Sequence, residues 1–174
     1  MKVLAWVAPD TWRSLVAAVR DRTGPGDGVT LVALVDDAVV SAGGGAAAGL
    51  LGRGRDTGER LAAIWEADAH ALLAEAREAL GEATEVSAEV RRGRPERVLV
   101  QLSAGVDLLV MARDGDAHPG PHSLDRVGRF VVDHVTCPVL LLPRPDAGPP
   151  VLPPEPPARR SARPGPGRPP RRNG

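Results

Sequence analysis

The sequence predicts an open, parallel α/β sheet with helices on both faces, and three observations lead to this fold class. Short apolar runs alternate with segments of helical periodicity over residues 1–143. Several runs are continuously apolar, which is typical of strands covered on both faces. Apolar residues make up 43% of the 174-residue chain, which is enough for one hydrophobic core. Because alternating strands and helices pair through right-handed crossovers, we expect five parallel strands.

The N-terminal half supplies the first two strands and the first helix. Residues 3–7 and 29–35 are apolar runs, and the second is rich in β-branched residues. Apolar residues recur at helical spacing from Trp12 to Val19, and Gly24 marks the end of that helix.

A long Gly/Ala-rich connection and a long helix follow. The connection spans residues 36–58, and the helix is expected over 57–80. One apolar stripe should face the sheet, and it comprises Leu61, Ile64, Trp65, Leu72, Leu73 and Leu80.

The C-terminal half adds three strands and two helices. Residues 85–90 alternate as a half-exposed strand does, and a short helix begins near Pro95. Residues 106–112 predict a buried strand, 123–135 a helix and 137–143 the last strand.

The chain divides into an acidic body and a basic tail. Residues 1–143 hold 15 Lys and Arg against 20 Asp and Glu, whereas residues 144–174 hold 7 against 2. Pro, Arg and Gly dominate the tail, which predicts disorder with polyproline II character. Its arginines could contact nucleic acid or an anionic membrane, and its Pro154–Arg159 segment could contact a Pro-binding domain.

Several classes of protein are excluded by composition. The single cysteine, Cys137, allows neither an intrachain disulfide nor a cysteine-based zinc site, and we interpret it as a small buried residue. No apolar run approaches the roughly 18 residues of a membrane span, and the N-terminus lacks the pattern of a signal peptide. We therefore expect a soluble cytoplasmic protein.

The stretch DLLVMARDGDAHPGPHSLDRVGRF (residues 107–130) reads as a strand, a polar turn and the start of a helix. Parallel α/β proteins bind phosphates at this place, because a helix N-terminus offers free N–H groups. A phosphate loop favours glycine and hydroxyl side chains, yet this turn carries Asp114, Asp116 and Asp125.

The segments VRRGRPERVLVQLSAGVDLLVMA and LDRVGRFVVDHVTCPVLLLP resemble the universal stress protein family. The first is similar to that family's strand, Gly-x-Pro turn, short helix and following strand. The second is similar to its last helix and its terminal Cys-Pro-Val strand. The resemblance covers residues 1–143 and implies a Rossmann-like, adenine nucleotide alpha hydrolase-like fold.

ATP-binding members of that family carry Gly-x-x-Gly, nine residues, and then Gly-Ser or Gly-Thr. Here Ala112 stands at the first glycine, Gly115 matches the second, and Asp125 and Arg126 replace the last pair. The family's first strand ends in an Asp that contacts the nucleotide, and that position is Ala8. The resemblance therefore implies a degraded ATP site, and we expect no ATP binding in the usual manner.

The resemblance carries the family's ATP-site positions over to nine residues, most of which do not match the pattern. They are Ala8, Leu34, Met111, Ala112, Arg113, Gly115, Asp125, Arg126 and Val127. An alternative hypothesis keeps ATP or AMP binding through Arg113, Gly115 and Arg126, since arginine pairs well with phosphate oxygens.

Other candidate sites have plainer interpretations. The Gly/Ala-rich residues 41–55 lack the Lys-Ser/Thr of a Walker loop, so we interpret them as an insertion that could act as a lid. His118 and His122 fit a polar turn better than a metal site. The three tryptophans fit core positions, although Trp6 could occupy part of an adenine pocket.

The resemblance also implies a quaternary structure and a class of function. The last strand, with Val139, Leu140, Leu141 and Leu142, is apolar on both faces, and the family pairs this strand across a two-fold axis. We therefore expect a homodimer. Related enzymes of this architecture carry a Ser-Gly-Gly-x-Asp-Ser loop after the first strand, which is absent from VAPDTW, so we expect a non-enzymatic, stress-associated regulatory protein.

Overall fold

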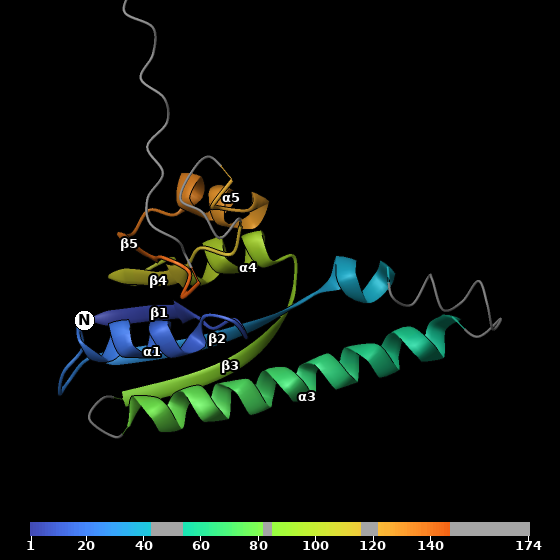
Figure 1. The fold of residues 1–174 in the computed structure, drawn as a ribbon, viewed down its shortest axis with the longest axis horizontal. Helices are drawn as coiled ribbons and strands as arrows, with labels where there is room; N and C mark the ends of the chain where they lie inside the picture. The colour runs from blue at the N-terminus through green and yellow to red at the C-terminus, as the bar shows by residue number, and fades with distance from the viewer. Residues whose placement is uncertain (43–53, 82–84, 116–121, 147–174) are drawn as a thin grey trace, which may run out of the picture.

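The computed structural model of the chain describes residues 1–42, 54–81, 85–115 and 122–146. In these residues, parallel strands form one sheet in the order β3-β2-β1-β4-β5, with helices on both sides (Figure 1). The strands are β1 (Lys2–Trp6), β2 (Gly28–Asp36), β3 (Glu85–Gly93), β4 (Leu108–Ala112) and β5 (Val139–Leu142). The labelled helices are α1 (Trp12–Arg20), α3 (Gly54–Leu80), α4 (Pro95–Leu102) and α5 (Arg126–His134). The predicted open parallel sheet is confirmed.

Strand alternation divides the core into two layers, one on each face of the sheet. Val3, Ala5 and Val7 pack with residues of α1 and α3. Leu4 and the half-buried Trp6 pack with residues of α4 and α5 on the opposite face. Because successive side chains of a strand point to opposite faces, β1 contributes to both layers and lies at the centre of the sheet.

The structure corrects three boundaries that the sequence analysis set. Residues 37–42 are helical, where a loop is expected, and the Asp36 carboxylate accepts the N–H of Ala38 at 2.8 Å at the start of this segment. The long helix begins at Gly54 rather than at residue 57. The last helix begins at Arg126 rather than at residue 123, because Asp125 caps it. The other residues of the 36–58 connection, 43–53, lie outside the described residues.

One residue of the predicted apolar stripe does not face the core. Ile64 is 55% exposed, whereas Leu73 and Leu80 are buried against the sheet. The reason is the face of α3 on which it lies: Ala62 is 3% exposed and packs with Val35 and Val40, and Ile64 is about 200° further around the helix. The stripe prediction is therefore wrong for Ile64.

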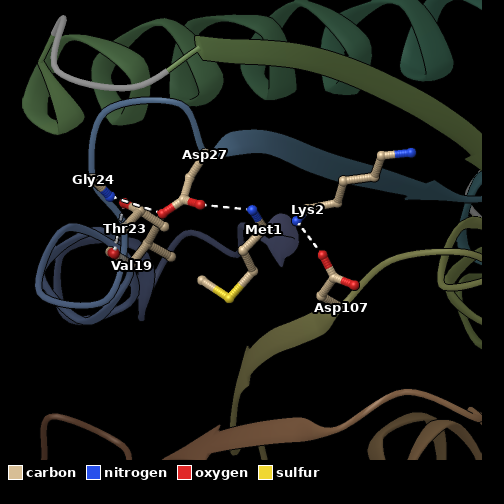
Figure 2. Close-up of polar contacts among 7 residues, drawn as sticks. All are labelled: Met1, Lys2, Val19, Thr23, Gly24, Asp27 and Asp107. Atoms are coloured by element: carbon tan, nitrogen blue, oxygen red, sulfur yellow. Dashed lines mark hydrogen bonds and ion pairs between the residues drawn. The ribbon is translucent and has the colours of Figure 1, made fainter.

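Polar contacts fix the amino-terminal edge of the sheet (Figure 2). The Met1 ammonium donates to Asp27 at 2.7 Å, and the same carboxylate accepts the N–H of Gly24 at 2.9 Å. The N–H of Lys2 donates to Asp107 at 2.6 Å. The ammonium–carboxylate contact raises the pKa of the Met1 amino group and lowers that of Asp27. These contacts lie at the opposite edge from the predicted site.

Residues just beyond 143 contact the body of the protein. The Arg144 guanidinium donates to Asp146 at 2.8 Å and to the carbonyl of Gly115 at 3.4 Å. The rest of the predicted tail, residues 147–174, lies outside the described residues. Across the described part of the chain, we find no helix with the length and apolar character needed to span a bilayer.

Candidate functional site

The carboxyl-terminal edge of the sheet brings the predicted turn and the start of α5 together. The N–H of Gly115 donates to the carbonyl of Ser123 at 3.3 Å, and the Arg113 guanidinium donates to the Ser123 hydroxyl. In a parallel sheet the strands open into loops at this edge, which is where such folds bind ligands. The two halves of the phosphate-motif alignment are thus adjacent in space.

The remaining aligned positions lie on or next to the same edge. Met111 is fully buried, and Leu34 and Val127 pack against its cluster on the α4/α5 face. Ala8 follows β1, and its carbonyl accepts the N–H groups of Thr11 and Trp12 at 3.1 and 3.0 Å. The Ala8 side chain is a methyl group, so it offers no hydrogen-bond acceptor at the position where the family carries a carboxylate.

Asp125 occupies the N-terminus of α5 in the manner of a bound anion. Its Oδ1 accepts the N–H of Gly128 at 2.6 Å, with an extended backbone at Asp125. An N-cap carboxylate satisfies one of the free N–H groups of the first turn and interacts favourably with the helix dipole. A carboxylate of the chain therefore uses one of the N–H donors that a phosphate at this helix would need.

A second carboxylate lies beside the cap. The carboxylate of Asp114 lies close enough to that of Asp125 to interact with it electrostatically. Partial desolvation, together with the charge and hydrogen bond of Asp125, raises the pKa of Asp114 to about 6. A neighbouring negative charge disfavours ionisation of Asp114, which agrees with the direction of this shift. The sequence analysis noted the acidic turn but not this pairing, and the two acids flanking the turn are the signal that could have indicated it.

Gly115 has a steric role in this turn. A Cβ atom placed on it would lie 2.1 Å from the carbonyl oxygen of His122 and 2.8 Å from the carbonyl carbon of Ser123. Real Cβ atoms do not approach backbone atoms so closely, so only glycine fits here. The one glycine that matches the family pattern is thus required by the local backbone, whether or not a ligand binds.

The groove next to this turn has mixed charge. Its volume is about 480 Å³. Its lining residues are Gly115, His122, Leu124, Asp125, Arg126 and Arg129. The Arg129 guanidinium donates to the carbonyl of Leu124 at 3.1 Å, and Arg126 is exposed. The groove thus combines cationic side chains with the carboxylate of the cap.

Arg126 also borders a second cavity, of about 550 Å³, between α4 and α5. Arg94 and Arg97 line it at the start of α4, and Phe130 lines it on α5. The sequence analysis did not single out Arg94 or Arg97. The spacing Arg-Pro-x-Arg directly after a strand is the signal that could have indicated them.

Cys137, His134 and Trp6 have defined positions on the α4/α5 side of the sheet. Cys137 is half-buried and packs against the α4/α5 core. His134 is exposed, and its ring stacks on Phe130 with 3.8 Å between ring centroids. Trp6 packs against the α4/α5 core rather than lining one of the two grooves described above.

The described residues contain no group of three His, Cys, Asp or Glu side chains that could hold a metal ion. His122 is exposed and lines the groove beside Gly115, whereas His118 lies outside the described residues.

Comparison with solved structures supports the fold assignment. The structure of hypothetical protein MJ0577 superposes with a TM-score of 0.67 at 18% identity, covering 82% of this chain and 95% of that one. The universal stress protein UspA from Lactobacillus plantarum superposes with a TM-score of 0.62 at 19% identity, covering 82% of this chain and 97% of that one. A universal stress protein in complex with cAMP superposes with a TM-score of 0.57 at 17% identity, covering 83% of this chain and 97% of that one. At these identities the likeness shows the fold alone.

Comparison at the level of sequence gives the family. No curated protein matches the chain. The model of the universal stress protein family matches residues 9–143, which is most of the chain. This range begins just after β1 and ends just after β5, so it contains the acidic turn and the capped helix described above. The chain therefore belongs to the universal stress protein family.

Proposed function

We propose that this protein is a non-enzymatic regulatory member of the universal stress protein family that does not bind ATP in the family's usual manner. The observation that carries the proposal is the hydrogen bond from the Gly128 N–H to the Asp125 carboxylate, at 2.6 Å. This carboxylate stands where the family pattern has Gly-Ser, at the helix N-terminus that would receive phosphate oxygens.

The cost of placing a phosphate there can be estimated. A carboxylate about 4 Å from a phosphate charge costs about 4 kcal/mol at an effective dielectric of 20. A micromolar affinity corresponds to about 8 kcal/mol in total. Ala8, which lacks the adenosine-binding carboxylate, removes a further contact. Together these changes remove most of a micromolar affinity, although they need not add.

An adenine nucleotide module is the second candidate, and the arginines favour it. Arg113 and Arg126 flank the capped helix, and Arg126 is exposed to the groove. A universal stress protein of the same fold has been solved in complex with cAMP. In this alternative the arginines supply the positive charge that a glycine-rich loop supplies through its N–H groups.

Calorimetric titration with Mg-ATP, AMP and cAMP tests the proposal. We expect no binding of Mg-ATP tighter than about 1 mM. The combined variant Ala8→Asp, Ala112→Gly, Asp125→Gly, Arg126→Ser should restore binding at least partly, because it recreates the family pattern. If the unmodified protein binds ATP at micromolar concentration and Arg126→Ala abolishes binding, the second candidate is correct.

The proposal includes a homodimer formed through β5. In the described sheet β5 is the last strand, so within one chain its outer backbone edge has no strand partner. Its four residues are only half-buried in the single chain, and all four are apolar. An apolar sheet edge of this kind favours pairing with another strand.

A further inference from the structure

A cavity of about 630 Å³ lies at the carboxyl end of β2, on the face of the sheet that α3 covers. Its closed end is apolar and includes the buried side chains of Val7, Ala33 and Val35. The half-buried Trp65 and Leu72 of α3 form the opposite wall. Ligand pockets typically measure roughly 300–1,000 Å³ and have mostly apolar walls. The cavity therefore has the size and lining of a small-molecule site.

This cavity is separate from the capped helix. Its lining includes neither the β4–α5 turn nor the start of α5. Of the nine positions aligned with the family's ATP site, only Leu34 is among the described lining residues. A ligand bound here would contact α3, which carries none of those nine positions. The cavity thus differs in position and in chemistry from the phosphate end of the aligned site, and it adjoins the adenosine end at Leu34 and beside Ala8.

The polar groups at the cavity all carry the same charge. Three carboxylates line it, Asp36 at the end of β2 and Asp68 and Glu75 on α3. Among the lining residues that the structure describes, there is no Lys, Arg or His. Within the described residues, no ion pair includes any of the three carboxylates.

Two nearby acids outside the lining, Asp37 and Glu66, do have a cationic partner. Arg92 pairs with Asp37 at 2.6 Å and approaches Glu66 at 3.9 Å. Arg92 is therefore committed to residues outside the cavity lining. The three lining carboxylates thus border an apolar space without an ion-pair partner among the described residues.

We propose that this cavity binds a small organic cation with an apolar body, such as an arylalkyl amine. The apolar body would lie against Val7, Val35 and Leu72, where its burial removes apolar surface from water. The ammonium would lie at the exposed mouth, close to Asp68 and Glu75. Charge complementarity selects a cation over a neutral or anionic molecule of the same shape.

Two further observations narrow the class of ligand. Trp65 lines the cavity, and an aromatic ring face attracts an organic ammonium ion. The three carboxylates do not form a cluster that could share a metal ion, since no such group occurs in the described residues. An organic ammonium ion, which needs only one or two carboxylates beside an apolar wall, fits this lining better than a metal ion does.

The test uses the full-length protein with three compounds of the same shape. They are 4-phenylbutylamine, which is cationic, 4-phenylbutanol, which is neutral, and 4-phenylbutyrate, which is anionic. Binding is measured by calorimetry and by Trp fluorescence, with Trp65→Phe identifying the Trp65 signal. We expect the amine to bind with a Kd of about 0.1–1 mM. The alcohol should bind about fivefold more weakly, and the anion more weakly still.

Variants then assign the site. Asp68→Asn combined with Glu75→Gln should weaken amine binding about fivefold and leave alcohol binding unchanged, because exposed ion pairs contribute modestly. Glu78→Gln is the matched control, since Glu78 lies on the same helix outside the lining. Ala71→Phe should block both amine and alcohol, because Ala71 is an exposed residue of the lining.

Each of three results would overturn the proposal. The first is equal affinity for amine, alcohol and anion. The second is a loss of amine affinity in Glu78→Gln as large as the loss in the double variant. The third is the absence of any amine binding at 5–10 times the expected Kd (about 5 mM), with no change in Trp65 fluorescence. The outcome does not depend on ATP binding, so it can be separated from the test of the proposed function.

Discussion

The Asp125 carboxylate accepts the backbone N–H of Gly128 at 2.6 Å, and this contact links the fold to the proposed loss of ATP binding. It stabilises the start of α5 from within the chain. A phosphate bound at the same helix would have to displace this carboxylate or lie beside it. One residue thus supports the helix and opposes the family's usual ligand.

The capping role of Asp125 leads to the first prediction. In an Asp114→Asn background, which removes the neighbouring carboxylate, Asp125→Ala should lower the free energy of unfolding by about 1 kcal/mol. The free energy of unfolding of Asp125→Ser should stay close to that of the parent, because serine also caps helices. Urea unfolding measures both. Asp133→Ala, at an exposed position of the same helix, is the control. An Asp125→Ala variant as stable as the parent would refute the capping role.

The raised pKa of Asp114 gives a prediction about pH. The pKa of Asp114 is about 6 in the folded protein and about 3.9 in an unfolded chain. Between these values the native state binds more protons than the unfolded state, so the free energy of unfolding should fall as pH rises through this window. Asp114→Asn removes this fall.

The free energy of unfolding of the variant should therefore equal that of the wild type near pH 4 and exceed it by about 1 kcal/mol at pH 7. This value is reduced for solvent screening, because Asp114 is exposed. Urea unfolding of both proteins across this pH range is the measurement. Parallel pH profiles for the two proteins would show that Asp114 does not titrate as described.

Gly115 provides a steric prediction. Gly115→Ala should destabilise the protein by about 1–3 kcal/mol, because the added Cβ would meet backbone atoms of His122 and Ser123 that cannot turn aside. Gly24→Ala is the matched control, since a Cβ there has no atom within 4 Å. Thermal or urea unfolding compares the two. Equal effects at both glycines would mean that the close approach at Gly115 is not maintained in solution.

The sheet edge gives a prediction about self-association. Leu141→Lys should weaken a dimer formed through β5, because it places a charge on a half-buried apolar strand. Leu141→Ala separates this effect from lost packing, since Leu141 also contacts the α4/α5 core. Sedimentation velocity at micromolar concentration gives the association state of each protein. A wild type that is strictly monomeric there would exclude this interface.

Most of the fold could be predicted from local pattern. Residues 29–35 and 108–112 are dominated by apolar side chains, and the structure contains β2 and β4 there because a sheet covered on both faces buries such runs. Residues 37–42 could not be predicted as helical, because a cap at Asp36 within a low-complexity segment is a weak local signal. The exposure of Ile64 depends on which face of α3 packs inward, and the structure places Ala62, Leu73 and Ala76 on that face with Ile64 opposite them.

The sequence by itself determined the family, the parallel sheet and the replacement of three phosphate-motif residues, since each depends on residue type and on spacing along the chain. Only the tertiary structure decided what those replacements do. It placed Asp114 against Asp125, directed Asp125 to the Gly128 N–H, and opened the cavity between β2 and α3. The cap is a local contact within the first turn of α5, whereas the cavity joins β2 to α3, segments far apart in sequence that strand order and helix packing bring together at one edge of the sheet.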